Sequence, residues 1–151
     1  MMPRVKRITP EETAILTAVG ELETQIFSDA WSLRSIHDAV ESPCMTLYAA
    51  LSETDELMGY LFFMQVLDEA EVANIAVSPD FRRNGVASSL LDTALENVDA
   101  DIFLEVRASN TPAIALYEKY GFLQYGVRRN YYESPREDAL LMQRHKEGNT
   151  R

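Results

Sequence analysis

Residues 74–88 read Asn-Ile-Ala-Val-Ser-Pro-Asp-Phe-Arg-Arg-Asn-Gly-Val-Ala-Ser, which is a β-prone run, a polar turn and the start of a helix. The first amides of a helix have no carbonyl partner within it and carry partial positive charge, so they attract phosphate. Gly85 lets the backbone approach a ligand, and Arg82 and Arg83 add cations. The spacing matches neither a P-loop nor a dinucleotide fingerprint. Local chemistry leaves two interpretations open: a phosphate-binding turn, or a helix start whose arginines offset nearby acids.

Strand-like and helix-like patterns alternate on both sides of this turn. Upstream, the sequence predicts a strand at 5–8, helices at 9–26 and 32–42 capped by Thr9 and Ser32, and a meander of strands at 45–51, 58–67 and 71–77. Downstream, it predicts a helix at 86–98, a strand at 102–106, a helix at 110–121 and a strand pair at 122–127 and 139–142 joined by a charged loop. This order predicts the α/β (α+β) class, with a mixed sheet and helices on both faces.

Length and composition favour one cytoplasmic domain. The 151 residues match the size of a single domain, and 46% are hydrophobic, enough to form a core. No run approaches the roughly 20 apolar residues that span a bilayer, and the N-terminus lacks the pattern of a signal peptide. A lone cysteine, Cys44, excludes an internal disulfide framework. We expect one domain at 1–151 with a disordered tail from about 146.

Acidic residues dominate the charge. The net charge is −10, and no Lys or Arg lies between Arg34 and Arg82, an interval that holds nine Asp and Glu residues. Such a concentration of negative charge repels nucleic acid and anionic membranes and attracts cations. The same acids can also form a solvated surface that has no further role. His37 and His145 lack metal-ligand spacing, so no metal is expected. We expect a monomer or weak dimer that binds neither nucleic acid nor membrane.

Four later segments are recognisable in order: 104–110 (LEVRASN), 113–118 (AIALYE), 121–122 (GF) and 128–132 (RRNYY). With Arg82-Arg83-Asn84-Gly85-Val86-Ala87, they resemble the GCN5-related N-acetyltransferases, and within them the RimI branch. The resemblance covers essentially the whole chain. It implies a mostly antiparallel acetyltransferase fold, acetyl-coenzyme A as cosubstrate, and a basic ribosomal protein as partner, acetylated on its N-terminal alanine. Two positions depart from the pattern: Ala87 replaces a glycine, and Ala30 replaces the proline that usually precedes Trp31.

The resemblance also implies which residues bind the cosubstrate. The backbone of the strand residues Ile75, Ala76 and Val77 would pair with the pantetheine arm. The turn would hold the pyrophosphate through Arg83, Asn84, Gly85, Val86, Ala87 and Ser88. Asn110 matches a further coenzyme A contact, and it can also cap the helix that follows it. Trp31, Tyr131 and Tyr132 are candidates for the acceptor site, although the two tyrosines can equally pack the last hairpin.

Two residues match the catalytic positions of the family. Glu105 coincides with the proton acceptor, although the residues alone favour a surface glutamate paired with Arg107. Tyr117 matches the proton donor, although a core tyrosine is the usual explanation for its helical spacing. An α-amino group has a pKa near 7.7–8.0, so a carboxylate suffices as its base. The sequence therefore predicts an N-terminal acetyltransferase, with a lysine or polyamine acetyltransferase and a non-catalytic acyl-CoA-binding module as alternatives.

Overall fold

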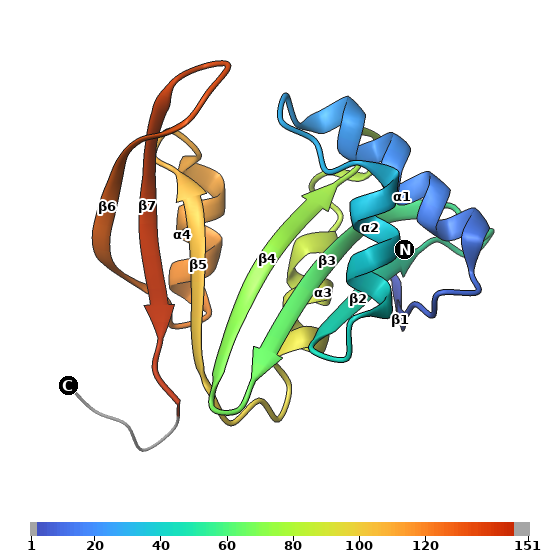
Figure 1. Ribbon diagram of the computed structural model, residues 1–151, viewed down its shortest axis with the longest axis horizontal. Coiled ribbons are helices and arrows are strands. Elements are labelled where there is room, and N and C mark those ends of the chain that lie inside the picture. The colour runs from blue at the N-terminus through green and yellow to red at the C-terminus, as the bar shows by residue number, and fades with distance from the viewer. Residues whose placement is uncertain (1–2, 147–151) are drawn as a thin grey trace. The chain divides into compact units, whose positions relative to one another are not determined.

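The computed structural model describes residues 3–146 as two compact units (Figure 1). The first unit comprises 3–64 and 73–97, and the second comprises 65–72 and 98–146. Within the described residues one sheet contains seven strands in the order β1 (Arg4–Arg7), β2 (Met45–Leu51), β3 (Leu57–Val66), β4 (Glu69–Val77), β5 (Asp101–Arg107), β7 (Glu137–Arg144) and β6 (Leu123–Tyr132). Strand β4 crosses from the second unit into the first. Of the predicted tail, only Lys146 lies within the described residues, where its amide donates to Asp101 Oδ1 at 2.7 Å.

The first unit carries most of the helices. Its elements are β1 (Arg4–Arg7), α1 (Thr13–Ile26), α2 (Leu33–Glu41), β2 (Met45–Leu51), most of β3 (Leu57–Val66), the second half of β4 (Glu69–Val77), a short 3₁₀ turn (Pro79–Phe81) and α3 (Val86–Leu95). The pairs β1–β2 and β2–β3 are antiparallel. In Figure 1, α1 and α2 lie on one face of these strands and α3 on the other. The buried face of α1, with Leu16, Val19 and Leu22, packs into the core with Ile36 of α2.

The second unit contains β5 (Asp101–Arg107), α4 (Thr111–Lys119), β6 (Leu123–Tyr132) and β7 (Glu137–Arg144) together with the start of β4. Residues 69–71 of β4 pair in parallel with 101–103 of β5. The pairs β5–β7 and β7–β6 are antiparallel. The sheet is therefore mixed and mostly antiparallel, which confirms the predicted class.

Several predicted boundaries were wrong. The helix predicted at 86–98 ends at Leu95. The first helix begins at Thr13, because the Glu12 amide donates to the Thr9 carbonyl at 3.1 Å and closes a separate turn before the helix. The loop predicted between the last two strands is mostly strand, so Tyr131 and Tyr132 belong to β6. Ser32, in contrast, caps α2 as predicted, with its side chain accepting from the Ser35 amide at 3.0 Å.

Gly59 of β3 permits an unusually close approach between elements of the first unit. A Cβ atom there would lie 2.7 Å from the Ala76 carbonyl oxygen and 3.0 Å from Val86 Cγ1. A methyl group has no room at the first distance, because the neighbour is backbone. Gly59 therefore fixes the end of β4 and the first residue of α3 against β3, and so sets the position of the turn between them. Among residues 3–146, no helix is long and apolar enough to cross a membrane.

Candidate active site

The turn before α3 has the backbone shape that a helix-end anion site needs. Gly85 is the N-cap of α3 with φ 72° and ψ 19°, which is the left-handed conformation. Few side chains adopt it, and glycine does so without strain. The first α3 hydrogen bond to the cap runs from the Ser89 amide to the Gly85 carbonyl at 3.0 Å. The amides of Val86, Ala87 and Ser88 therefore precede the helical ladder and point out of the helix end.

Side chains hold this turn in shape. Asn84 donates from Nδ2 to the Phe81 carbonyl at 3.1 Å and to the Arg82 carbonyl at 3.3 Å. Arg82 donates from Nε to the Val77 carbonyl at 3.4 Å, so that guanidinium is tied back to the end of β4. Arg83 is exposed, with a positive φ of 68°. The turn thus presents helix amides and the exposed Arg83 cation together, as a phosphate site requires.

The predicted strand residues lie where β4 ends. Ile75 and Val77 are partly buried and Ala76 is 6% exposed. The Ser78 amide donates to the Met58 carbonyl at 2.8 Å and fastens the chain to β3 just before the turn. The structure therefore places these three residues and the turn consecutively in the first unit, in the order that the resemblance requires.

Glu105 lies on β5 in a group of polar side chains within the second unit. Its Oε2 lies 3.5 Å from a guanidinium nitrogen of Arg128, and Tyr131 donates a hydrogen bond to its carboxylate. The Arg128 guanidinium also lies 5.1 Å from the centre of the Tyr131 ring. Arg107, the partner that the sequence suggested for Glu105, pairs with Glu137 at 3.0 Å. Glu105 is thus linked to β6, the strand that carries the two tyrosines.

A second carboxylate, Glu71, lies beside Glu105 and was not singled out from the sequence. The parallel register pairs Glu71 with Phe103, and Phe103 and Glu105 are two residues apart, so all three side chains share one sheet face. Burial, and then the charge of Glu105, raise the pKa of Glu71. The same two carboxylates, Glu105 first, contribute to raising the pKa of Tyr131. The alternation of acidic and apolar residues in 69–72 could have predicted this, because in a strand it places Glu71 on one defined face of the sheet.

Tyr117 is buried in α4, only 5% exposed, with its ring 6.0 Å from that of Phe122. Burial, and to a lesser degree Tyr132, raise its pKa well above the ordinary value for tyrosine. The phenol therefore keeps its proton throughout the neutral range, as a proton donor must. The core interpretation and the predicted catalytic one are compatible here, because a packed ring can still present a protonated hydroxyl.

The start of α4 is fastened to β7. The side chain of Asn110 caps the helix by accepting from the Ala113 amide at 3.3 Å. One residue earlier, Ser109 donates its amide and its hydroxyl to Glu137 at 3.0 and 3.1 Å. These bonds from Ser109, and then the bond from Arg107, lower the pKa of Glu137. Arg107 also lies 4.4 Å from the Tyr132 ring centre, which joins β5 to β6.

The backbone of Trp31, in the first unit, is held by the buried carboxylate of Glu23, which was not predicted from the sequence. Its amide donates to Glu23 Oε2 at 2.9 Å. Glu23 is 2% exposed and also accepts from the Tyr60 hydroxyl and from Asn74 Nδ2, the latter at 2.8 Å. Three donors from three segments satisfy a carboxylate that would otherwise be costly to bury. The signal was an acid on the apolar face of α1, at i+4 from Val19.

The known proteins that this chain resembles agree with this geometry. The acetyltransferase (GNAT) family model matches residues 14–122, so the chain belongs to that family and is an acetyl-CoA-dependent N-acetyltransferase. It is 37% identical over 141 residues to the [ribosomal protein bS18]-alanine N-acetyltransferase of Escherichia coli, covering 89% of this chain and 94% of that one. A putative enzyme of the same name from Bacillus subtilis is 37% identical over 129 residues, covering 82% and 85%.

Solved structures give the same result. The crystal structure of the Escherichia coli ribosomal-protein-S18-alanine N-acetyltransferase superposes with a TM-score of 0.87 at 32% identity, covering 99% of this chain and 97% of that one. Ard1 from Thermoplasma volcanium gives 0.81 at 25% identity, covering 97% and 99%. Acetyl-CoA is the cosubstrate of this family, and the described residues contain no group of His, Cys, Asp and Glu that could hold a metal.

The turn before α3 predicts a charge-specific effect on coenzyme A binding. Gly85→Asp should lower the affinity more than tenfold, because it places a carboxylate beside the helix amides; tenfold corresponds to about 1.4 kcal/mol. Gly85→Asn is the matched control, since asparagine has the same size and also tolerates the left-handed conformation. An added Cβ meets nothing within 4 Å, so there is room for the first side-chain atom of both variants, and the strain of the left-handed backbone is common to both. Equal coenzyme A affinities of the two variants by calorimetry would contradict this assignment.

The coupling between Glu71 and Glu105 predicts a shift in a titration. A raised pKa means that the protonated form of Glu71 is favoured in the folded state. Its contribution to stability is therefore present below the ordinary pKa and is lost as the pH rises through the raised value. Glu105→Gln should lower the pKa of Glu71, measured by carboxyl NMR, while burial keeps it above the ordinary value. The exposed Glu118→Gln should leave it unchanged; an identical Glu71 titration in both variants would contradict the coupling.

Proposed function

We propose that this enzyme acetylates the α-amino group of a protein, and that its acceptor is the N-terminal alanine of a small-subunit ribosomal protein. The observation that carries the proposal is near full-length similarity, 37% over 141 residues, to an enzyme named for that reaction on bS18. An N-alpha-acetyltransferase from Saccharolobus solfataricus, 44% identical over 81 residues, supports the α-amine as the acceptor group. Such an acceptor would place the reaction in the cytoplasm.

The chemistry of the acceptor agrees with a carboxylate base. An α-amine with a pKa of about 7.7–8.0 is substantially neutral at cellular pH, whereas a lysine amine near 10.4 is almost fully protonated. We assign Glu105 as the base that takes the proton from the attacking amine, directly or through water. The pairing of Glu105 with Arg128 and Tyr131 supports this role, because it orients the carboxylate on the sheet face.

The rest of the reaction follows from the bonds that change. The amine nitrogen attacks the thioester carbonyl, the new C–N bond forms and the C–S bond breaks. The departing thiolate, with a conjugate acid near 8.5 by analogy with cysteine, takes a proton from the Tyr117 hydroxyl. The raised pKa of Tyr117 ensures that this proton is present when the thiolate forms. The transfer is direct within a ternary complex and forms no covalent enzyme intermediate.

We assign cosubstrate binding to the first unit. The proposal places the pantetheine arm against the backbone of Ile75, Ala76 and Val77, and the pyrophosphate on the amides that follow Gly85. The left-handed Gly85 and the tied Asn84 support it. The resemblance also assigns Asn110 as a contact of coenzyme A. We also propose that both units form one acetyltransferase domain, since the family model extends from one into the other.

The surface charge supports a basic acceptor. Eight of the nine acids between Arg34 and Arg82 are exposed, Glu71 being the exception. A ribosomal protein is basic because it binds RNA, so these exposed acids attract it and accelerate encounter. Charge also suits a polyamine or a lysine side chain, which keeps those two acceptors as the alternatives that an experiment must separate. The predicted monomer or weak dimer stays a prediction.

The acceptor proposal predicts a ranking of peptide substrates. A peptide with a free N-terminal alanine followed by Arg or Lys should be acetylated faster than one followed by Glu, and the difference should shrink as salt shortens the Debye length from about 10 Å at 0.1 M to 3 Å at 1 M. Thiol release from acetyl-CoA measures the rate. The control is the same peptide with its α-amine blocked and its lysine kept. Equal rates for blocked and free peptides would transfer the assignment to a lysine acetyltransferase.

A further inference from the structure

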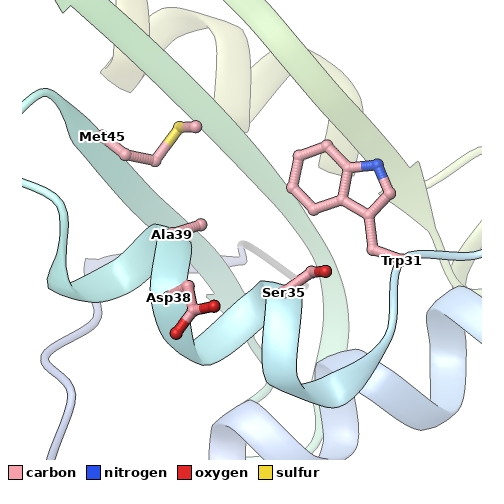
Figure 2. Close-up of a pocket in the computed structure, with 5 residues that line it drawn as sticks. All are labelled: Trp31, Ser35, Asp38, Ala39 and Met45. Atoms are coloured by element: carbon pink, nitrogen blue, oxygen red, sulfur yellow. The ribbon is translucent and has the colours of Figure 1, made fainter.

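A pocket beside Trp31 in the first unit has no role in the reaction described above. It has a volume of about 460 Å³ and is lined by Trp31, Ser35, Asp38, Ala39 and Met45 (Figure 2). Figure 2 shows three of these residues along α2, with Trp31 on the loop before that helix and Met45 on β2. The pocket is therefore built entirely by segments that are close together in the sequence.

Helical spacing accounts for one wall. Ser35, Asp38 and Ala39 stand at i, i+3 and i+4, so they share one face of α2. Ile36 points to the other side and is fully buried in the core, which fixes the rotation of the helix. The Ser32 hydroxyl donates to Ser35 Oγ at 3.0 Å, so the Ser35 side chain is held in place. This wall thus carries a fixed hydroxyl and an exposed carboxylate.

The opposite wall is the Trp31 indole, and it is rigid. Its backbone is held by the buried Glu23, and its ring packs 4.9 Å from the ring of Phe62, which is completely buried. A ring fixed by a core neighbour keeps its remaining surface available without a loss of side-chain entropy on binding. Met45 and Ala39 add apolar surface, and both pack against the core.

The composition of the pocket selects the charge of its occupant. Asp38 is the only charged residue among the five that line it, and no Lys or Arg follows Arg34 until Arg82. A cation gains both from the face of an indole and from a nearby carboxylate, and arginine uses both because its planar guanidinium stacks. The aliphatic stem of the same side chain fits against methionine and alanine. An acidic side chain would be repelled by the negative charge of Asp38.

We propose that this pocket binds an arginine or lysine side chain of the acceptor protein, with the Trp31 indole and the Asp38 carboxylate both attracting its cation. The inference rests on the proposed function for the identity of the partner, since a basic ribosomal protein supplies such side chains. The pocket then acts as a specificity site that recognises the acceptor through a residue other than its N-terminal amine. Binding in the pocket, however, requires neither acetyl-CoA nor a free α-amine.

The test uses Trp31 itself as the probe, since it is the only tryptophan of the chain. The enzyme without acetyl-CoA is titrated with N-acetyl-arginine amide, and separately with N-acetyl-citrulline amide, which has nearly the same shape and no charge. The arginine compound should change the Trp31 emission and bind at least about threefold more tightly, the size expected of an exposed ion pair with cation–π contact. Equal affinities for the two compounds, or no change in emission, would overturn the proposal.

Two variants of α2 separate this site from general surface charge. Asp38→Asn should remove the preference for arginine over citrulline, whereas Glu41→Gln removes the same charge from an exposed residue of α2 that does not line the pocket, and should keep the preference. With a basic alanine peptide and acetyl-CoA, Asp38→Asn should raise KM about threefold and leave kcat unchanged. If the arginine compound does not bind preferentially but the alanine peptide is acetylated normally, the proposal for the pocket alone is refuted. Normal binding without α-amine acetylation would refute the proposed function instead.

Discussion

The close approach of β3 to the end of β4 and the start of α3 is the constraint on which the first unit depends. Gly59 provides it, because any Cβ atom would fall within 2.7 Å of the Ala76 carbonyl. With β4 held there, the chain must reverse into α3 within a few residues, and the left-handed Gly85 completes that reversal. The helix amides then face outward at a fixed position. A sheet contact thus determines the geometry of the proposed pyrophosphate site.

The order of elements could be predicted from the sequence, because most strands and helices have a clear apolar period and Ser32 is an unambiguous cap. Boundaries failed where backbone bonds formed that the local pattern does not specify. Glu12 accepts from the Thr9 amide as the capping pattern predicts, yet the Glu12 amide closes a separate turn on the Thr9 carbonyl and the helix begins only at Thr13. The polar sequence around Tyr131 resembles a loop, yet pairing with β7 extends it as a strand. Long-range pairing overrides local propensity there.

The candidate site was less accessible to sequence reasoning, because its electrostatics depend on which strands become neighbours. The resemblance pointed to Glu105 and Tyr117 as single residues. The parallel register of β4 and β5 adds Glu71 to Glu105, and the β6 strand adds Arg128. The burial of Glu23 is likewise explained only by hydrogen-bond donors from other segments of the chain. In each case the sequence shows the charged residue, but it does not show which residues of other segments will contact it.

The measurement that tests the account most directly is the turnover of Tyr117→Phe with an alanine peptide, determined together with its affinity for acetyl-CoA. The substitution keeps the ring that packs against Phe122 and removes only the hydroxyl, which is the proposed source of the proton for the thiolate. The account predicts a fall in kcat of about 10²- to 10⁴-fold, the range of general acid catalysis, with unchanged acetyl-CoA affinity and an unchanged melting temperature. A folded variant that binds acetyl-CoA normally and turns over at the rate of the original enzyme would contradict the assignment of Tyr117 as the proton donor.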